Sequence, residues 1–105
     1  MAKTIQKHLP LFKILAESSD AQRSAILKTL NPAQLRAVLE AIYNVLRGTC
    51  TISDKLKKKL YQHRRVIRRL VSKDLTRQQQ QRLINKHRTL LPLLLKPVIE
   101  FLSLG

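Results

Sequence analysis

Residues 31–48, NPAQLRAVLEAIYNVLRG, carry the start, the buried face and the end of one helix. Asn31 can cap the helix with its side chain, and Pro32 suits the first helical position because no N–H donor is needed there. Gly48 suits the left-handed conformation that often ends a helix. Between them, apolar residues recur at spacings of three and four, which predicts an amphipathic helix with one buried face: Leu35, Val38, Leu39, Ile42 and Leu46.

Similar start and stop residues predict helices on both sides of this stretch and no convincing strand. Ser19 with Gln22, and Thr76 with Gln79, have the spacing of capping boxes and indicate two helix starts. The expected helices outside 31–48 are residues 9–16, 20–29, 54–72, 76–84 and 90–104, with a polar break at 85–89. In the helix at 20–29, the residues expected to face inward are Ala21, Ala25 and Ile26.

The composition fits a folded domain rather than a tail or a fibre. The chain has 105 residues, of which 44% are hydrophobic, and it contains two Gly and four Pro. That apolar fraction is enough for a core, which a disordered basic tail would lack. We predict an all-α fold, a compact single domain (residues 1–105) of about five to six short helices. Within it, residues 1–46 are weakly charged, residues 47–88 strongly basic and residues 89–105 apolar.

Positive charge is concentrated in the middle of the chain. The 21 Lys and Arg outnumber the 6 Asp and Glu, which gives a formal net charge of +15. Residues 47–88 hold fourteen basic and two acidic side chains, whereas residues 1–46 hold six and three, and residues 89–105 are neutral. A charge of this size favours a polyanionic partner: DNA, RNA or an anionic membrane.

Eight of the fourteen basic residues in 47–88 fall on the expected helix from Asp54 to about Ser72, for which Ser53 can act as the cap. A helical wheel separates an apolar row from a broad basic arc. The apolar row consists of Leu56, Leu60, His63, Ile67, Leu70 and Val71. Because like charges at helical spacing repel, an arc without carboxylates is expected to bind a polyanion. The candidate nucleic-acid-binding residues are Lys55, Lys57, Lys58, Lys59, Arg64, Arg65, Arg68, Arg69, Lys73, Arg77, Arg82, Lys86 and Arg88.

The expected partner of these residues is the phosphate backbone of double-stranded DNA. Arginines can bind phosphate oxygens through two N–H groups, and lysines act as point charges. The arc has few Asn and Gln side chains of the kind that read base edges. Single-strand binders stack bases on aromatic rings, and of the four aromatic residues only Tyr61 lies in the arc. Charge alone does not separate DNA from RNA.

No constellation of residues indicates catalysis or a metal site. His8, His63 and His87 are far apart in sequence and lack Cys, Asp or Glu at ligand spacing, and we expect His63 to pack in the apolar row. Cys50 is the single cysteine, which excludes an internal disulfide and a cysteine-based zinc site. No carboxylate pair suggests acid–base catalysis. We therefore expect a protein that is not an enzyme, with no cofactor and no small-molecule substrate.

The C-terminal segment Leu90–Leu104 is apolar almost all round, with Pro92 near its start and a kink expected at Pro97. At about 15 residues, it is shorter than the roughly 20 that span a bilayer. A helix without a polar face is usually buried, so a core helix is the first expectation. The alternatives are self-association, or contact with a capsid or membrane, through this segment.

Short motifs that match a known group of proteins are spread along most of the chain: His8-Leu9-Pro10, Ala25-Ile26-Leu27-Lys28, Asn44-Val45-Leu46-Arg47-Gly48, Ile52-Ser53, Lys57-Lys58-Lys59-Leu60 with His63, and the segment from Leu90 to Pro97. In these motifs the chain resembles small basic core-type proteins of Polinton/Maverick elements and adintoviruses, which are adenovirus-like DNA elements of animals. Its basic-then-apolar C-terminal part also resembles the adenovirus core protein X, the mu peptide. One departure is that the family pattern has Gly-Gly before the apolar stretch, where this chain has Lys86-His87-Arg88-Thr89.

The resemblance implies a protein of the virion core and host nucleus that packs double-stranded DNA. Combined with the charge, it leads to an expected function: binding and condensation of double-stranded DNA without sequence specificity. Three alternatives stay open from the sequence. They are a membrane-active or capsid-associated viral protein that uses the apolar segment, an RNA-binding helical domain, and a helical adaptor for acidic protein partners.

Overall fold

Helices in this chain begin where the sequence provides capping side chains. Ser19, Asn31 and Thr76 each accept a hydrogen bond from the backbone N–H three residues later. In each case the Gln side chain at that later position accepts a hydrogen bond from the backbone N–H of the cap residue, which completes a capping box. Ser53 caps a further helix by accepting from the Leu56 N–H at 3.2 Å. The helix starts expected at these four positions are confirmed.

The computed structural model describes residues 3–103, whose regular structure is helical and contains no strand. The predicted all-α class is confirmed, but these residues form more helices than the expected five to six. Residues 3–103 contain eight α-helices and one 3₁₀ turn: α1 (Lys3–Lys7), α2 (Leu9–Glu17), α3 (Asp20–Lys28), α4 (Pro32–Leu46), α5 (Asp54–Gln62), α6 (Arg64–Leu70), α7 (Arg77–Lys86), η1 (Arg88–Leu90) and α8 (Leu91–Ser103).

The additional helices have two sources. Helix α1 has no counterpart among the expected helices, and its Ile5 is fully buried. The helix expected over residues 54–72 is broken at His63, which has φ −107° and ψ 17° and separates α5 from α6. His63 is exposed, so the prediction that it packs in the apolar row is wrong. A continuous helix would turn this imidazole toward the core between Leu60 and Ile67, and the break avoids the cost of its desolvation.

Helix α4 ends at a glycine, as predicted. Gly48 has φ +77°, a left-handed conformation that side chains with a Cβ rarely adopt. The Gly48 N–H donates to the Val45 carbonyl at 3.1 Å, and the Thr49 N–H donates to the Asn44 carbonyl at 3.0 Å. This pair of bonds is a Schellman motif, which satisfies carbonyls that a helix end leaves without partners.

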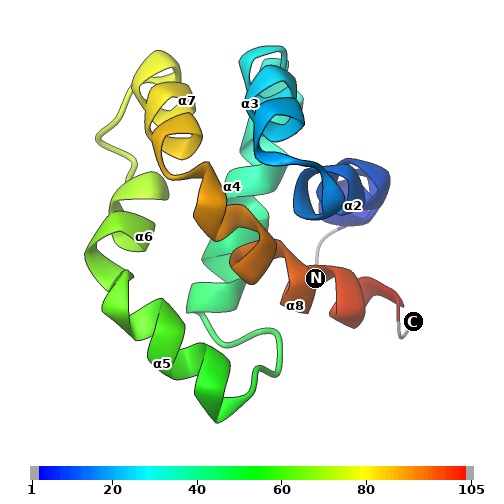
Figure 1. The fold of residues 1–105 in the computed structure, drawn as a ribbon, viewed down its shortest axis with the longest axis vertical. Coiled ribbons are helices and arrows are strands. Elements are labelled where there is room, and N and C mark those ends of the chain that lie inside the picture. Colours follow the sequence, from blue (N-terminus) through cyan, green and yellow to red (C-terminus); the bar gives the residue numbers. More distant parts are fainter. Residues whose placement is uncertain (1–2, 104–105) are drawn as a thin grey trace.

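The helices are arranged around α8, which crosses the middle of the molecule (Figure 1). Helix α8 packs against α2 and α4, and α3 packs against α7. Helix α6 contacts α7 and α5, so that α5, α6 and α7 form one side of the domain, on the left in Figure 1. The radius of gyration is 12.6 Å, a typical value for a compact domain of this length.

The core is built from the faces that these helices turn toward one another. Helix α4 contributes most of the expected face, but Leu46 is 39% exposed, because Val45 takes the inward position in the last turn. The fully buried large side chains include Phe12, Leu15, Leu27, Val38, Ile42, Ile67, Leu70, Ile84, Leu91, Leu94 and Leu95. With the fully buried Ile5 of α1, they come from every α-helix except α5, which contributes the buried side chain Leu60.

Helix α3 turns a charged residue inward. Ala21 and Ala25, which were expected to face the core, are exposed, and Ile26 is only partly buried. The inward positions belong to Arg23 and Leu27. Burial of Arg23 is possible because its guanidinium finds backbone acceptors.

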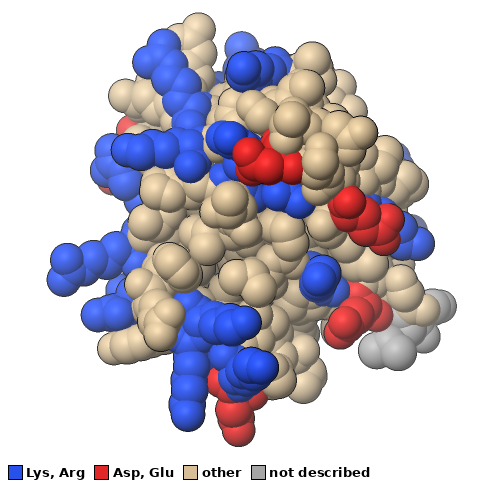
Figure 2. Space-filling view, viewed as in Figure 1, with Lys and Arg blue, Asp and Glu red and all other residues tan. Residues whose placement is uncertain are grey.

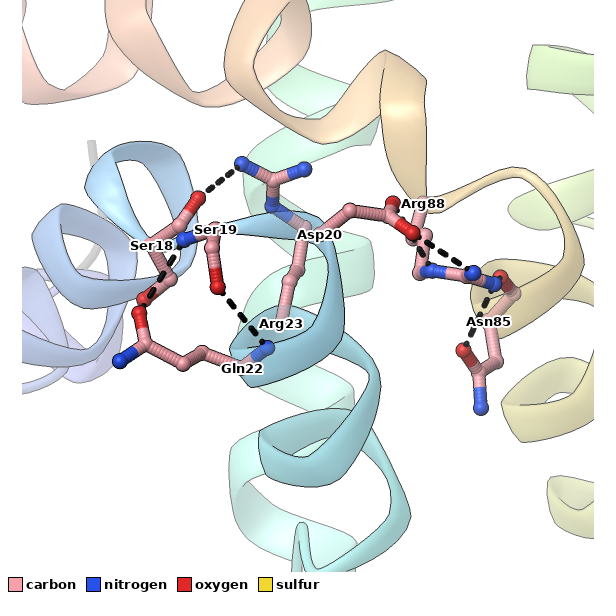
Figure 3. A network of polar contacts seen from close by, with 7 residues as sticks. All are labelled: Ser18, Ser19, Asp20, Gln22, Arg23, Asn85 and Arg88. Atoms are coloured by element: carbon pink, nitrogen blue, oxygen red, sulfur yellow. Dashed lines mark hydrogen bonds and ion pairs between the residues drawn. The ribbon is translucent and has the colours of Figure 1, made fainter.

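The Arg23 side chain closes the C-terminal end of α2 (Figure 3). Its Nε donates to the Leu15 carbonyl at 2.6 Å, and its Nη2 donates to the Ser18 carbonyl at 2.7 Å. Carbonyls at a helix end carry a partial negative charge and lack intrahelical partners, so a cation suits them. Arg23 therefore fixes the angle between α2 and α3.

Replacing Arg23 with methionine is expected to lower the free energy of unfolding by about 2–3 kcal/mol, because one buried and one partly buried carbonyl would lose a charged donor. Methionine keeps most of the side-chain volume, so the change removes hydrogen bonds more than packing. Urea denaturation followed by circular dichroism measures the effect. The same substitution at Arg36, an exposed residue of α4, is the control and should change the value by less than about 0.5 kcal/mol. Equal stabilities of the two variants would contradict the role of Arg23.

The apolar C-terminal segment forms the central helix of the fold. Helix α8 continues through Pro97, and its buried residues are Leu91, Leu94, Leu95, Pro97, Val98 and Leu102. The expectation of a core helix is therefore met over Leu91–Ser103, while Leu104 lies outside the described residues. Among residues 3–103, no helix has the length and apolar character needed to cross a bilayer. The polar break expected at residues 85–89 is shorter, because α7 extends to Lys86 and η1 begins at Arg88.

Candidate nucleic-acid interface

Helix α5 presents a dense row of lysines to solvent. Its N-terminus is fixed by the Ser53 cap, and it is held to the core by Leu60, which is buried, and Leu56, which is partly buried. Every other residue of α5 is exposed, including all four candidate lysines: Lys55, Lys57, Lys58 and Lys59. The sequence pattern produces this result directly, since two leucines four residues apart leave the remainder of a short helix to solvent.

Helix α6 continues the basic surface with arginines. Ile67 and Leu70 are buried and orient the helix, while Arg65, Arg68 and Arg69 are exposed. Arg64 differs from them because it is partly buried. Its guanidinium carbon lies 4.1 Å from the centre of the Tyr61 ring, and its Nη1 donates to the Tyr61 carbonyl at 3.0 Å. Arg64 thus covers one face of the exposed Tyr61 ring across the break at His63.

Helix α7 places three candidates on the same side of the domain. Arg77, Arg82 and Lys86 are exposed, whereas Ile84 is buried and anchors the helix. Lys73 precedes α7 in the connecting loop and is also exposed. Two of the α7 residues, Arg82 and Lys86, line a recess together with Arg69 of α6. The structure therefore brings together candidates that are up to 17 positions apart in the sequence.

Arg88 is placed differently from the other candidates. Its Nη2 lies 2.8 Å from the Asp20 carboxylate in an ion pair, and its Nε donates to the same carboxylate at 3.0 Å. Its Nη1 donates to the Asn85 carbonyl at 2.9 Å. Figure 3 shows this bridge from the start of α3 to the end of α7. The guanidinium of Arg88 is occupied within the fold, so it is less suited to a phosphate than the exposed candidates.

The basic side chains are concentrated over α5, α6 and α7. Figure 2 shows Lys and Arg projecting along the left and lower edges, the side that these helices occupy in Figure 1. The carboxylates of this part of the chain are Asp54, in the first turn of α5, and Asp74, in the loop before α7. Asp54 stabilises the start of α5 through the helix dipole. The repulsion among twelve neighbouring candidates is left largely uncompensated.

A larger hollow of the surface lies beside this region. It has a volume of about 910 Å³ and is bordered by α4 on one side and by the end of α6, the following loop and the start of α7 on the other. Its wall from α4 includes Leu35, Leu39 and Tyr43, and its basic rim includes Lys73 and Arg77. Sequence reasoning did not find this groove, because its two walls are about 40 positions apart in the sequence.

Histidine and cysteine side chains are placed as isolated groups. Partial burial lowers the pKa of His87 below its ordinary value, and electrostatic interactions with Lys86 and with the His63 side chain lower this pKa further. His87 is therefore neutral at pH 7 and adds no charge to the basic surface. Burial raises the pKa of the Cys50 thiol, which keeps it protonated at neutral pH. Within residues 3–103, no three His, Cys, Asp or Glu residues are grouped so that they could hold a metal ion.

Comparison with known proteins gives no relative for this arrangement. No protein-family model matches the sequence, no curated protein matches it, and no solved structure matches the fold.

Proposed function

We propose that this protein binds double-stranded DNA through the backbone phosphates, without sequence specificity, and compacts it as a virion core protein. The observation that carries the proposal is the uncompensated basic surface over α5, α6 and α7. Its candidates are exposed, apart from the partly buried Arg64 and the paired Arg88. When such a surface neutralises the phosphates of a polyanion, the counterions condensed on the polyanion are released, which favours binding.

The chemistry of the surface favours phosphate contacts over base contacts. Exposed arginines offer two N–H groups to phosphate oxygens, and the lysines of α5 add charge without fixed geometry. Tyr61 is the aromatic ring within this surface, and Arg64 covers one of its faces. A single half-covered ring is a poor platform for stacking successive bases, as single-strand binders require. These features support duplex DNA as the partner.

The resemblance to core-type proteins of Polinton/Maverick elements and adintoviruses supports the biological part of the proposal. It leads us to propose a location in the virion core and host nucleus. Condensation requires that one protein molecule or oligomer bridge two DNA segments. We therefore further propose that the protein self-associates or contacts DNA on more than one side. Burial of α8 in the core leaves its exposed remainder, including Phe101 at 37% exposure, as a small surface for such contacts.

The test is a titration of the purified protein against a random-sequence DNA duplex at 50, 100 and 200 mM salt. If about six to eight phosphates are contacted, the logarithm of the binding constant should fall with the logarithm of the salt concentration with a slope of roughly −5 to −7. Duplexes of different sequence should give the same slope and affinity. Weak binding with a flat slope would refute the proposal.

The same titration distinguishes the competing functions. Tighter binding to an RNA duplex than to a DNA duplex of the same length would favour the RNA-binding alternative. Binding to vesicles that contain anionic lipid, with no binding to either duplex, would favour the membrane alternative.

A further inference from the structure

We propose that the recess between α6 and α7 is a discrete binding site for one phosphate group of a nucleic-acid backbone. The inference rests on the proposed function and deepens it. The proposed function describes electrostatic attraction between DNA and the whole basic surface, and the inference assigns the binding of one phosphate group to one location. The recess has a volume of about 210 Å³ and is lined by Arg69, Leu75, Gln79, Arg82, Leu83 and Lys86.

Three cationic residues from two helices line the recess. Arg69 comes from the last turn of α6, and Arg82 and Lys86 lie four residues apart on α7. Like charges at this helical spacing repel, and the third cation adds to the repulsion. No carboxylate lines the recess, and among residues 3–103 no ion pair or hydrogen bond engages these three groups. An anion bound among them would relieve this repulsion and accept several charge-assisted hydrogen bonds.

A fourth donor is held in a fixed orientation. The Gln79 Oε1 accepts the Thr76 N–H at 2.8 Å, as part of the capping box that starts α7. Because this bond fixes the carbonyl end of the amide, the Nε2 group is held in place with its two N–H donors. The sequence predicts the role of Gln79 in the capping box from its spacing to Thr76. It does not predict that the Gln79 amide lines a recess with three cationic residues.

Part of the lining of the recess is apolar. Leu75 and Leu83 line it and are partly buried. A sugar ring next to a bound phosphate could cover these two leucines, which a free inorganic ion could not do. The recess therefore combines three cationic residues, an amide donor and two leucines, whereas the hollow on α5 is lined by Lys57, Lys58, Tyr61 and Gln62 and includes no arginine and no leucine. Backbone phosphate with its adjoining sugar is therefore the group that fits.

The experiment is an NMR titration of the isotope-labelled full chain with inorganic phosphate at constant ionic strength, followed by titration with a short DNA duplex. The Gln79 side-chain amide and the Leu75 and Leu83 methyl groups are the reporters. We expect saturable shifts of these reporters with phosphate, larger than the shifts of α5 amides. The duplex should shift the same signals at far lower concentration, because it supplies the sugar and further phosphates.

A matched pair of variants tests the assignment. Arg69→Gln and Arg68→Gln remove the same charge from neighbouring exposed positions of α6, but only Arg69 lines the recess. We expect Arg69→Gln to weaken phosphate binding about tenfold, since a hydrogen bond from a charged group is lost. Arg68→Gln should weaken it less than about threefold. The amide spectrum of each variant verifies that the fold is intact.

The outcomes separate this inference from the proposed function. Equal weakening by both variants, or phosphate shifts spread over α5 and the recess alike, would overturn the discrete site. If DNA binding with a steep salt slope persisted in that case, the proposed function would stand alone. Localised phosphate shifts in a protein that does not bind DNA would support the site as an anion site and refute its assignment to a nucleic-acid backbone.

Discussion

Replacing Lys57, Lys58, Arg65 and Arg69 with glutamine is expected to lower the affinity for a random-sequence DNA duplex by about three orders of magnitude near 0.1 M salt. All four side chains are exposed on α5 and α6. Each phosphate contact contributes about 0.9 to the salt slope through counterion release, so four lost contacts make the slope shallower by roughly 3.6. Fluorescence anisotropy of a labelled duplex, at the three salt concentrations given above, measures both quantities.

A second quadruple variant separates the basic surface from net charge. Glutamine at Lys3, Lys7, Lys13 and Lys96 lowers the net charge by the same amount, and these lysines are exposed on α1, α2 and α8. We expect this control to weaken binding less than about tenfold and to leave the salt slope nearly unchanged, because distant charges act only through a screened field. Equal losses in the two quadruple variants would show that overall charge, not the surface over α5–α7, determines binding.

The parts of the fold that could be predicted are those encoded within a few residues. A capping side chain and the N–H that it accepts lie three positions apart, so Ser19, Asn31, Ser53 and Thr76 reveal their helices without any tertiary information. The same holds for Gly48, whose left-handed conformation is a local requirement of the helix end. The lysines of α5 could be assigned to solvent because two leucines define the inner face of a helix that short.

The parts that could not be predicted depend on residues far apart in the chain. A buried Arg23 is unexpected from its sequence neighbours, because its burial depends on the carbonyls that the end of α2 brings to it. The break at His63 was missed for a related reason. A helical wheel assumes one continuous helix. In the structure α6 packs against α7, and Leu60 and Ile67 are both buried, while the imidazole of His63 is turned outward.

In the candidate site, too, local features could be predicted from the sequence and long-range contacts could not. Charge and helical periodicity identified the residues that form the basic surface, because exposure of Lys and Arg is the usual result of both. Neither could show that Arg88 pairs with Asp20, which lies 68 positions earlier in the chain. Neither could show that Arg69 and Lys86 border one recess. Composition thus predicts a polyanionic partner, and the tertiary structure determines which Lys and Arg side chains are exposed and unpaired.

Replacing Phe12 with alanine is expected to lower the free energy of unfolding by about 3–5 kcal/mol, the largest stability effect that we expect from a single substitution. Phe12 is fully buried in α2, and α2 and α8 form the most extensive helix pair of the fold. Small domains have a total stability of only about 5–15 kcal/mol, so the loss would be a large share of it. Thermal and urea denaturation measure the change.

The matched control for this prediction lies two residues further along the same helix. Ile14 is 51% exposed, and its replacement by alanine should change the free energy of unfolding by less than about 1 kcal/mol, since little apolar surface returns to water. Alanine favours helix slightly over isoleucine, which further reduces the cost at this position. Comparable losses at the two positions would mean that the face of α2 that carries Phe12 is not the one that packs in the core. A loss of stability only at Phe12 would instead show that this buried face holds α2 to the rest of the domain.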